Sequence, residues 1–305
     1  MGNINYQFTL SLLIIALGYL LKRLNIITQK DGETISKIIF NVTLLALIIN
    51  TFSTIKIVSS LILLPIIGVI YGVFMCLWIL FIFRKDDKSR RGLLSMALSG
   101  LNIGLFAYPF VEALWGENGL KYIAMFDIGN SIIVFVVCYL VGSYFSPSKK
   151  SIKFNYIIKT MFKSVPFLVY ILSLMLNLFG LHLPGMVMDI SKILSKSNMP
   201  LTLILLGVYL NFSFETMYWK IIIKALCTKY ITGLLVGAML YFIMPFDLLF
   251  RHTVLLSAIL PIPIVMIPYA IQFNYDQKFI GTLINMTIII SFILSWLIFT
   301  ITSIA

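Results

Sequence analysis

The stretch "ILPIPIVMIPYA", residues 259–270, places three prolines, Pro261, Pro263 and Pro268, in a segment that is otherwise almost entirely apolar. Proline lacks a backbone N–H and clashes with the preceding turn, so one proline costs the interior of a helix about 3 kcal/mol. A helix interrupted here needs other groups to satisfy the carbonyls that the prolines leave without partners. The composition of the whole chain indicates where such an interruption can lie.

The composition is that of a membrane protein. Of the 305 residues, 60% are hydrophobic and only 11% are charged, and the mean hydropathy is +1.03. A soluble chain of this length could not cover its surface with so few charges, so we expect an all-α protein whose outer surface faces the lipid bilayer. The net charge of +12 comes from short basic clusters between apolar runs. Such clusters flank membrane spans, and without a basic stripe carrying interleaved aromatic residues no nucleic-acid partner is expected.

Segment length predicts ten transmembrane helices. A bilayer core of roughly 30 Å requires about 20 helical residues. The predicted spans are residues 4–21, 38–54, 58–82, 93–114, 121–145, 162–180, 199–214, 224–243, 253–273 and 280–303.

The distribution of basic residues predicts the orientation. With the N-terminus outside, 18 Lys and Arg residues, Lys229 among them, are assigned to the loops after spans 1, 3, 5, 7 and 9, and five to the other side. The positive-inside rule makes the richer side cytoplasmic, so we expect a multi-pass plasma-membrane protein with both termini extracellular. Lys22 and Arg23 follow the first apolar run, which favours a retained helix over a signal peptide. No basic residue is expected at the centre of a span.

The basic segment "SPSKKSIKFN" (146–155) divides the chain into two nearly equal parts. We predict a first five-helix repeat at 1–145, a cytoplasmic linker at 146–161 and a second five-helix repeat at 162–305. An odd number of helices in each half makes the second half insert upside down, as in many secondary transporters. The alternative is ten helices without internal symmetry.

The fourth span of each half carries an interruption. "SGLNIGLFAYPF" (99–110) contains Asn102, Gly104 and Pro109, and its counterpart in span 9 contains Pro261. Interrupted helices at matched positions of two halves indicate a transporter site, although a lone proline in a membrane helix is usually only a kink. A break creates a new half-helix N-terminus, which carries partial positive charge and suits a carboxylate. Two such helices crossing would form an anion site without Lys or Arg.

Four motifs in order resemble the auxin efflux carrier family, bacterial permeases related to the plant auxin carriers. The motifs are "SGLNIGLFAYPFVEALWGENGL" (99–120), "DIGN" (127–130), "NMPLTLILLGVYL" (198–210) and "AILPIPIVMIPYAIQFNYD" (258–276). The resemblance implies ten helices in two inverted repeats, with broken helices 4 and 9 crossing in a transport domain beside a scaffold domain. It also implies a homodimer formed through the scaffold domain, and substrates that are organic anions, including auxin in plants and malate-like acids in bacteria.

By this resemblance, substrate binds at the crossing. The expected binding residues are Asn102, Gly104, Pro109, Pro261, Ile262 and Pro263. Leu45 replaces a proline of the family pattern, position 262 is polar in the plant carriers, and Pro263 and Pro268 are additional here. Auxin is therefore not assumed to be the ligand.

Further polar residues fall within the predicted spans. Asp127 and Asn130 lie one helical turn apart and are candidates for proton coupling, since intramembrane carboxylates are usually functional. The alternative is that Asp127 caps the outer end of its helix near the interface. Asn41 and Asn285 are expected either to line the site or to form hydrogen bonds between helices.

The sequence argues against an enzyme. The two histidines, His182 and His252, lie far apart in predicted loops and cannot form a His-Glu-x-x-His site. The three cysteines are isolated, so we expect no metal, no cofactor and no catalytic residue. The prediction is a secondary transporter of small organic anions that works by alternating access, and the alternative is a membrane sensor or assembly subunit that transports nothing.

Overall fold

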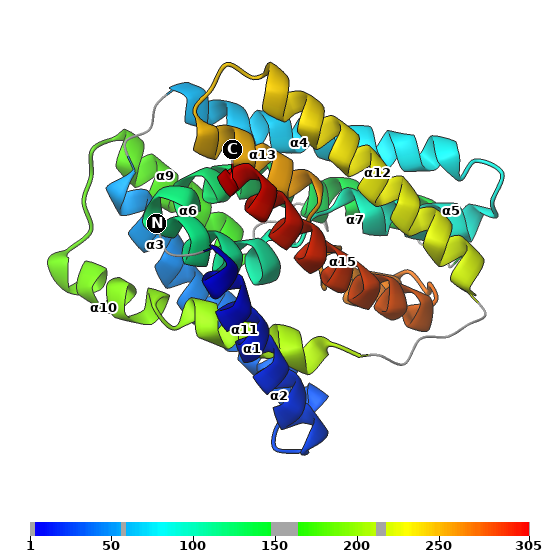
Figure 1. Ribbon diagram of the computed structural model, residues 1–305, viewed down its shortest axis with the longest axis horizontal. Coiled ribbons are helices and arrows are strands. Elements are labelled where there is room, and N and C mark those ends of the chain that lie inside the picture. Colours follow the sequence, from blue (N-terminus) through cyan, green and yellow to red (C-terminus); the bar gives the residue numbers. More distant parts are fainter. Residues whose placement is uncertain (1–3, 56–58, 148–163, 212–217, 305) are drawn as a thin grey trace.

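The computed structural model describes residues 4–55, 59–147, 164–211 and 218–304, which form helices and connecting loops without any strand in these ranges (Figure 1). Five helical segments are long and apolar enough to cross a membrane: Gln29–Ser53, Ser60–Ile82, Ile103–Tyr144, Trp219–Ile243 and Gln277–Ile301. Large side chains such as Leu13, Ile70 and Phe242 are exposed on the outer surface. These observations agree with a helical membrane protein.

The helices follow the predicted order. In the first half they are α1 (Ile4–Arg23), α2 (Gln29–Ile38), η1 (Ile39–Thr43, π-helical), α3 (Leu44–Thr54), α4 (Ser59–Ile82), α5 (Lys88–Ser99), η2 (Ile103–Ala107, π-helical), α6 (Tyr108–Ile132), η3 (Ile133–Val137, π-helical) and α7 (Cys138–Tyr144). In the second half they are α9 (Val165–Leu178), α10 (Gly185–Ser195), α11 (Asn198–Tyr209), α12 (Trp219–Ile243), α13 (Leu248–Ala258), α14 (Met266–Gln272) and α15 (Gln277–Ile304). Most of the predicted linker lies outside the described residues.

Several predicted spans have wrong bounds, among them the second and the seventh. The helix predicted to begin at residue 38 begins at Gln29, because Thr28 caps it and forms a reciprocal capping box with Asp31. The span predicted at 199–214 ends at Tyr209 and is preceded by α10, which starts at Gly185. Lys30, Asp31 and Glu33 near the start of α2 lower its local hydropathy, so a search for apolar length does not find that part of the helix.

The longest apolar segment contains a turn. Ile103–Tyr144 has 42 residues, which at 1.5 Å per residue is about 60 Å, twice the thickness of a bilayer core. Gly116 interrupts it with φ 57° and ψ −149°, a backbone conformation that other residues rarely adopt. The chain therefore turns between the predicted fourth and fifth spans.

The helices pack in two groups. The first helix group consists of α1, α2, η1, α3, α9, α10 and α11, in which α1 packs along α11 and α3 packs against α9 and α10 (Figure 1). The second helix group consists of α4 to α7 with η2 and η3, together with α12 to α15, and here α4 packs against α5 and α6 while α12 packs against α13. Glycines allow close approach within the first group: a Cβ on Gly207 would lie 2.0 Å from the Ile15 carbonyl oxygen of α1.

Candidate functional site

Two non-helical segments meet within the second helix group. After α5 ends at Ser99, residues 100–102 are not helical, and after α13 ends at Ala258 the helical path resumes only at Met266. The Asn102 N–H donates a hydrogen bond of 2.9 Å to the Pro261 carbonyl. The two segments therefore lie in direct contact, although about 160 residues separate them in the sequence.

Polar side chains satisfy the backbone of both segments. The Asn130 amide group pairs with Leu101, accepting from its N–H at 3.0 Å and donating to its carbonyl at 2.9 Å. In the other segment, the Ile262 N–H donates to the Thr287 hydroxyl at 3.1 Å, and the Ser291 hydroxyl donates to the Ile259 carbonyl at 2.6 Å. Unpaired backbone groups are costly in an apolar interior, so these bonds are what allows the helices to be interrupted there.

A cavity of about 540 Å³ opens beside the contact, between the two helix groups. The first group contributes residues of α2, η1, α3 and α9, and the second contributes the segment 101–105, residues of α6 and η3, and residues 263–268. The volume suits a small molecule. Its polar lining residues are Ser36, Asn41, Asn102, Asp127, Asn130, Ser131, Ser164 and Tyr170.

Asn102 lines this cavity and has an unused hydrogen-bond donor among the described residues. Its Oδ1 caps the helix that starts at Ile103 by accepting from the Leu105 N–H at 3.2 Å. The side chain is only 5% exposed, and its Nδ2 is buried without a hydrogen-bond partner among the described residues. A buried N–H group of this kind is stabilised by an acceptor oxygen, so the site favours a ligand that supplies one.

Asp127 is the one charged side chain among the described residues that line the cavity. Its carboxylate accepts hydrogen bonds from the Tyr170 hydroxyl at 2.7 Å and from Asn130 Nδ2 at 3.2 Å, and a further hydrogen bond joins the hydroxyls of Tyr170 and Tyr108. It is 7% exposed and follows Gly116 by eleven residues, or about 16 Å along a helix, roughly half of a bilayer core. Asp127 therefore lies well inside a helical segment and not in its first turn after Gly116.

The structure brings together some of the sequence-predicted residues and not others. Asn102, Gly104, Asp127, Asn130, Asn41 and Pro263 all line the cavity. Pro109, Pro261 and Ile262 are buried and are not among the lining residues. Asn285 lies elsewhere, where its Oδ1 accepts from the Asn211 N–H at 2.8 Å and its Nδ2 donates to the Gly281 carbonyl.

The prediction for Lys229 is wrong. It was assigned to a cytoplasmic loop, but it lies in α12, is fully buried, and has its Nζ 3.5 Å from the Leu98 carbonyl near the C-terminal end of α5. No carboxylate in the described parts of the chain forms an ion pair with it. The partial negative charge of a helix C-terminus stabilises a cation, which gives a physical reason for its position. The signal was present in the sequence, because the predicted span 224–243 already included this residue.

Sequence reasoning also missed Tyr108 and Tyr170, whose hydroxyls hold Asp127. Tyrosine is common in apolar helices, and the 43 residues between Tyr170 and Asp127 give no local signal for their pairing.

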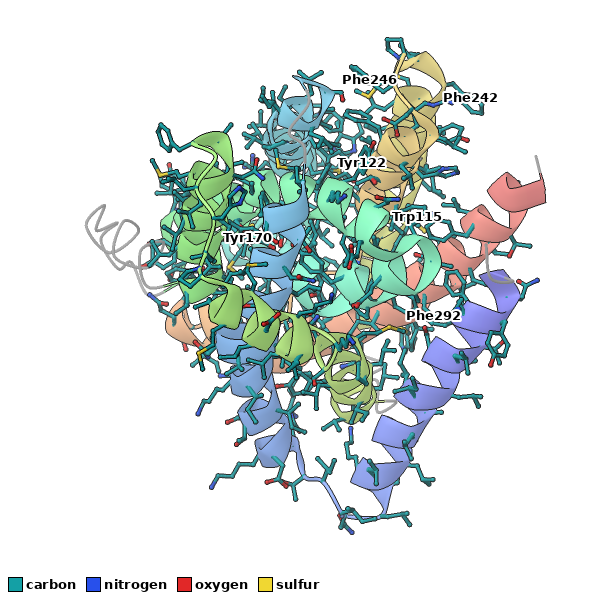
Figure 2. All side chains as sticks on the ribbon, turned by 90° about the vertical axis from the view of Figure 1, so that its left-hand side faces the viewer. Trp115, Tyr122, Tyr170, Phe242, Phe246 and Phe292 are labelled. Carbon is teal, nitrogen blue, oxygen red and sulfur yellow. The ribbon has the colours of Figure 1, made fainter. Side chains whose placement is uncertain are left out.

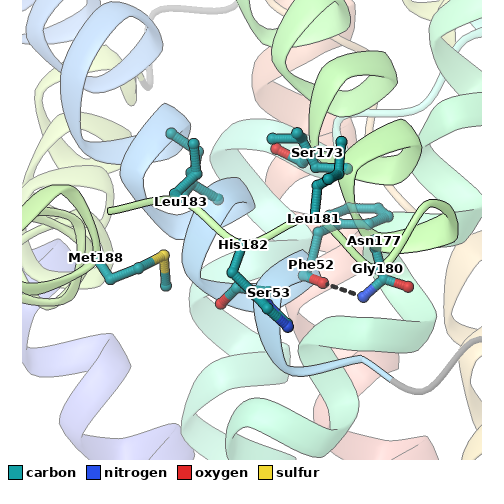
Figure 3. A pocket seen from close by; sticks show the side chains of 11 residues that line it. Phe52, Ser53, Ser173, Asn177, Gly180, Leu181, His182, Leu183 and Met188 are labelled. Atoms are coloured by element: carbon teal, nitrogen blue, oxygen red, sulfur yellow. Dashed lines mark hydrogen bonds between the residues drawn. The ribbon is translucent and has the colours of Figure 1, made fainter. Parts of the chain in front are cut away.

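A second, smaller cavity of about 220 Å³ lies between the ends of α3 and α9 and the start of α10. Figure 3 shows Ser53, Ser173, His182 and Met188 around it, with Asn177 bonded to the Phe52 carbonyl. Asn177 Nδ2 donates to the carbonyls of Phe52 and Ile55, both at 2.8 Å, and so caps the end of α3.

Comparison with known proteins shows which family the chain belongs to. Residues 10–300 match the model of a family described as membrane transport protein, which spans nearly the whole chain. The chain belongs to this family, the auxin efflux carrier family. It is 26% identical over 290 residues to an uncharacterized transporter from Methanothermobacter thermautotrophicus, covering 92% of this chain and 93% of that protein. It is also 26% identical over 212 residues to an uncharacterized transporter from Methanocaldococcus jannaschii, covering 66% of this chain and 67% of that one.

Proposed function

We propose that this member of the auxin efflux carrier family is a secondary transporter of small organic anions that binds a substrate carboxylate in the larger cavity. The observation that carries the proposal is the buried Asn102 Nδ2, which has no partner among the described residues. The first turn of the helix that starts at Ile103 lines the same cavity, and a helix N-terminus carries partial positive charge, although the Ile103 and Leu105 N–H groups already have acceptors in Leu101 and Asn102. Together these groups suit a carboxylate oxygen.

The electrostatics of the cavity favour coupling to protons. Among the described residues that line it there is no lysine or arginine, and the one carboxyl group among them belongs to Asp127. An anion beside ionised Asp127 would be repelled strongly in a medium of low dielectric constant. Substrate and a proton on Asp127 are therefore expected to bind together, with the Asn130 amide keeping the carboxyl group in place.

Repeated contacts support two inverted five-helix repeats with ten spans. If the halves are equivalent, α1 corresponds to α9, and α3 corresponds to α11. The packing of α1 on α11 is then the same contact as that of α9 on α3, made a second time. The segments around Leu101 and Ile262 are likewise each held by a polar side chain from the following helix, Asn130 or Thr287. Equivalent interruptions that cross at one point are the expected arrangement of such carriers.

Charge supports the proposed location in the plasma membrane with extracellular termini. Lys22 and Arg23 end α1, and Arg84, Arg90 and Arg91 surround the connection between α4 and α5. In the proposed orientation all of these face the cytoplasm. The two helix groups would move relative to each other and expose the cavity between them to each side in turn.

The experiment is uptake into proteoliposomes. Labelled mono- and dicarboxylates are tested one by one, with proton and sodium gradients imposed separately. Asn102→Ala is expected to abolish uptake, whereas Asn285→Ala, which removes an amide group outside the cavity, retains it. Uptake by Asn102→Ala at the unsubstituted rate would contradict the site, and a folded protein that transports no member of the panel would favour the sensor or assembly subunit.

A further inference from the structure

The two cavities follow each other along the same pair of helices. In α9, Pro166 and Tyr170 line the larger cavity, and Ser173 and Asn177, less than two turns further on, line the smaller one. The run from α2 to α3 also lines both cavities. Ser36, Phe40, Asn41 and Leu44 line the larger one.

Later in that run, Ile49, Phe52 and Ser53 line the smaller cavity. Ile49 follows Leu44 by five positions, which corresponds to a rise of about 7.5 Å along a helix. The two spaces therefore lie close to each other along these helices.

An aromatic pair lies where the two cavities approach each other. The rings of Phe52 and Tyr170 meet edge to face with their centroids 6.0 Å apart, at an interplanar angle of 72°. Phe52 lines the smaller cavity and Tyr170 the larger. Phe52 is 0% exposed and Tyr170 is 1% exposed, and Figure 2 shows Tyr170 in the interior of the bundle. The pair therefore lies between the two cavities.

Hydrogen bonds tie this barrier across the two helix groups. Phe52 and Tyr170 belong to the first helix group, through α3 and α9. The Tyr170 hydroxyl donates to Asp127 at 2.7 Å and is hydrogen-bonded to Tyr108, and both of these partners belong to α6 of the second group. If the groups move relative to each other during transport, these bonds must break.

We propose that the Phe52–Tyr170 pair is a gate between the two cavities. Asp127 and Tyr108 hold Tyr170 in the closed position. The smaller cavity is the vestibule on the far side of the gate, through which a small organic anion passes. The gate assigns a role to Tyr170 that goes beyond substrate binding. It rests on the proposed function, because a barrier that opens requires a solute that passes.

The test measures access to the larger cavity from each side of the membrane. Cys227 is the exposed cysteine, and Cys76 and Cys138 are buried, so the background variant is Cys227→Ser. Two reporter cysteines are introduced one at a time, Val134→Cys in the larger cavity and Ser53→Cys in the vestibule. Reconstituted vesicles are treated with a membrane-impermeant methanethiosulfonate reagent on one face or the other.

With the gate closed, the reagent is expected to reach the two reporters from opposite faces. Tyr170→Phe keeps the ring and removes its hydroxyl bonds. It should raise the labelling rate of Val134→Cys from the Ser53 face about tenfold, as expected for the loss of one or two buried hydrogen bonds. Phe52→Ala removes the other ring and should raise that rate further.

Tyr275→Phe is the matched control. Its hydroxyl donates a buried hydrogen bond of 2.8 Å to the Gly142 carbonyl, and it lines neither cavity, so its labelling rates should not change. Size-exclusion chromatography verifies that each variant is folded, and Phe52→Ala tests the gate if Tyr170→Phe is not folded.

Equal rates in Tyr170→Phe, Phe52→Ala and Tyr275→Phe would overturn the gate, as would labelling of Val134→Cys from both faces in the background variant. Labelling requires no substrate, so it separates the two proposals. Accelerated labelling without carboxylate uptake would overturn the transport function alone, and Asn102-dependent uptake without accelerated labelling would overturn the gate alone.

Discussion

Replacing Asn130 with alanine tests what holds the first helix interruption together. The Asn130 side chain is 4% exposed and forms two hydrogen bonds with the Leu101 backbone, at 3.0 and 2.9 Å, in addition to its bond to Asp127. Asn130→Ala leaves the Leu101 N–H and carbonyl without these partners in a buried position. We expect the folded state to lose stability while the chain still inserts into the membrane.

The size of the effect follows from those two groups. A buried backbone group left unsatisfied costs about 1–3 kcal/mol, whereas hydrogen bonds measured in membrane proteins are worth about 0.6–1.7 kcal/mol each. Two groups therefore give a loss of roughly 2–4 kcal/mol. At about 2 °C per kcal/mol for a chain of this size, the melting temperature should fall by about 4–8 °C.

The assay is thermal unfolding of the purified protein in detergent, followed by intrinsic fluorescence. Asn285→Ala is the control, because its Oδ1 accepts from Asn211, an exposed residue whose N–H water can reach. The control should lose less than about 1 kcal/mol. If both variants melted within 1–2 °C of each other, which is about the expected precision of one such measurement, the Asn130–Leu101 pairing would not be what stabilises the interruption.

Three further changes test other parts of the structure. Gly207→Val should prevent α1 from packing on α11, because the Cβ of the new valine would lie 2.0 Å from the Ile15 carbonyl oxygen. Size-exclusion chromatography should then show aggregated protein instead of a single folded peak. Lys229→Met should keep or raise the melting temperature. The buried charge has no ion-pair partner among the described residues, and an apolar side chain of similar volume removes its desolvation cost. A large fall in melting temperature would show that the bond to Leu98 is essential. Asp127→Asn should make uptake in proteoliposomes independent of pH, where the unsubstituted protein takes up more anion as the pH falls, and a retained pH dependence would assign Asp127 a structural role.

The spacing of polar residues within one helix was enough to predict part of the site. Asp127 and Asn130 lie three positions apart, and the structure joins them by a hydrogen bond. Asn102 was singled out by the family pattern, and it lines the cavity with an unpaired donor. Contacts such as that between Asp127 and Asn130 can be predicted because the geometry of a helix is local and fixed.

The residues that the sequence did not reveal are those whose partners lie far along the chain. Tyr170 meets Asp127 across 43 residues, and Lys229 meets Leu98 across 131. Asn41 and Asn285 looked equivalent in the sequence, yet only Asn41 lines the cavity. Which face of a helix is turned toward which neighbour depends on side-chain packing between helices, and apolar periodicity is weak when both lipid and protein surround the helix.

The sequence by itself determined the class of the protein and the sites of its helix interruptions. Lipid excludes unpaired backbone groups, so a chain with 60% hydrophobic residues had to form helices, and prolines such as Pro261 and Pro263 had to interrupt one of them. Only the tertiary structure decided what stands at the interruption. The contact of Asn102 with Pro261, the support of Leu101 by Asn130 and the hydrogen bond from Tyr170 to Asp127 all join separate helices. These contacts exist because each buried polar group must find a partner in three dimensions, wherever in the chain that partner lies.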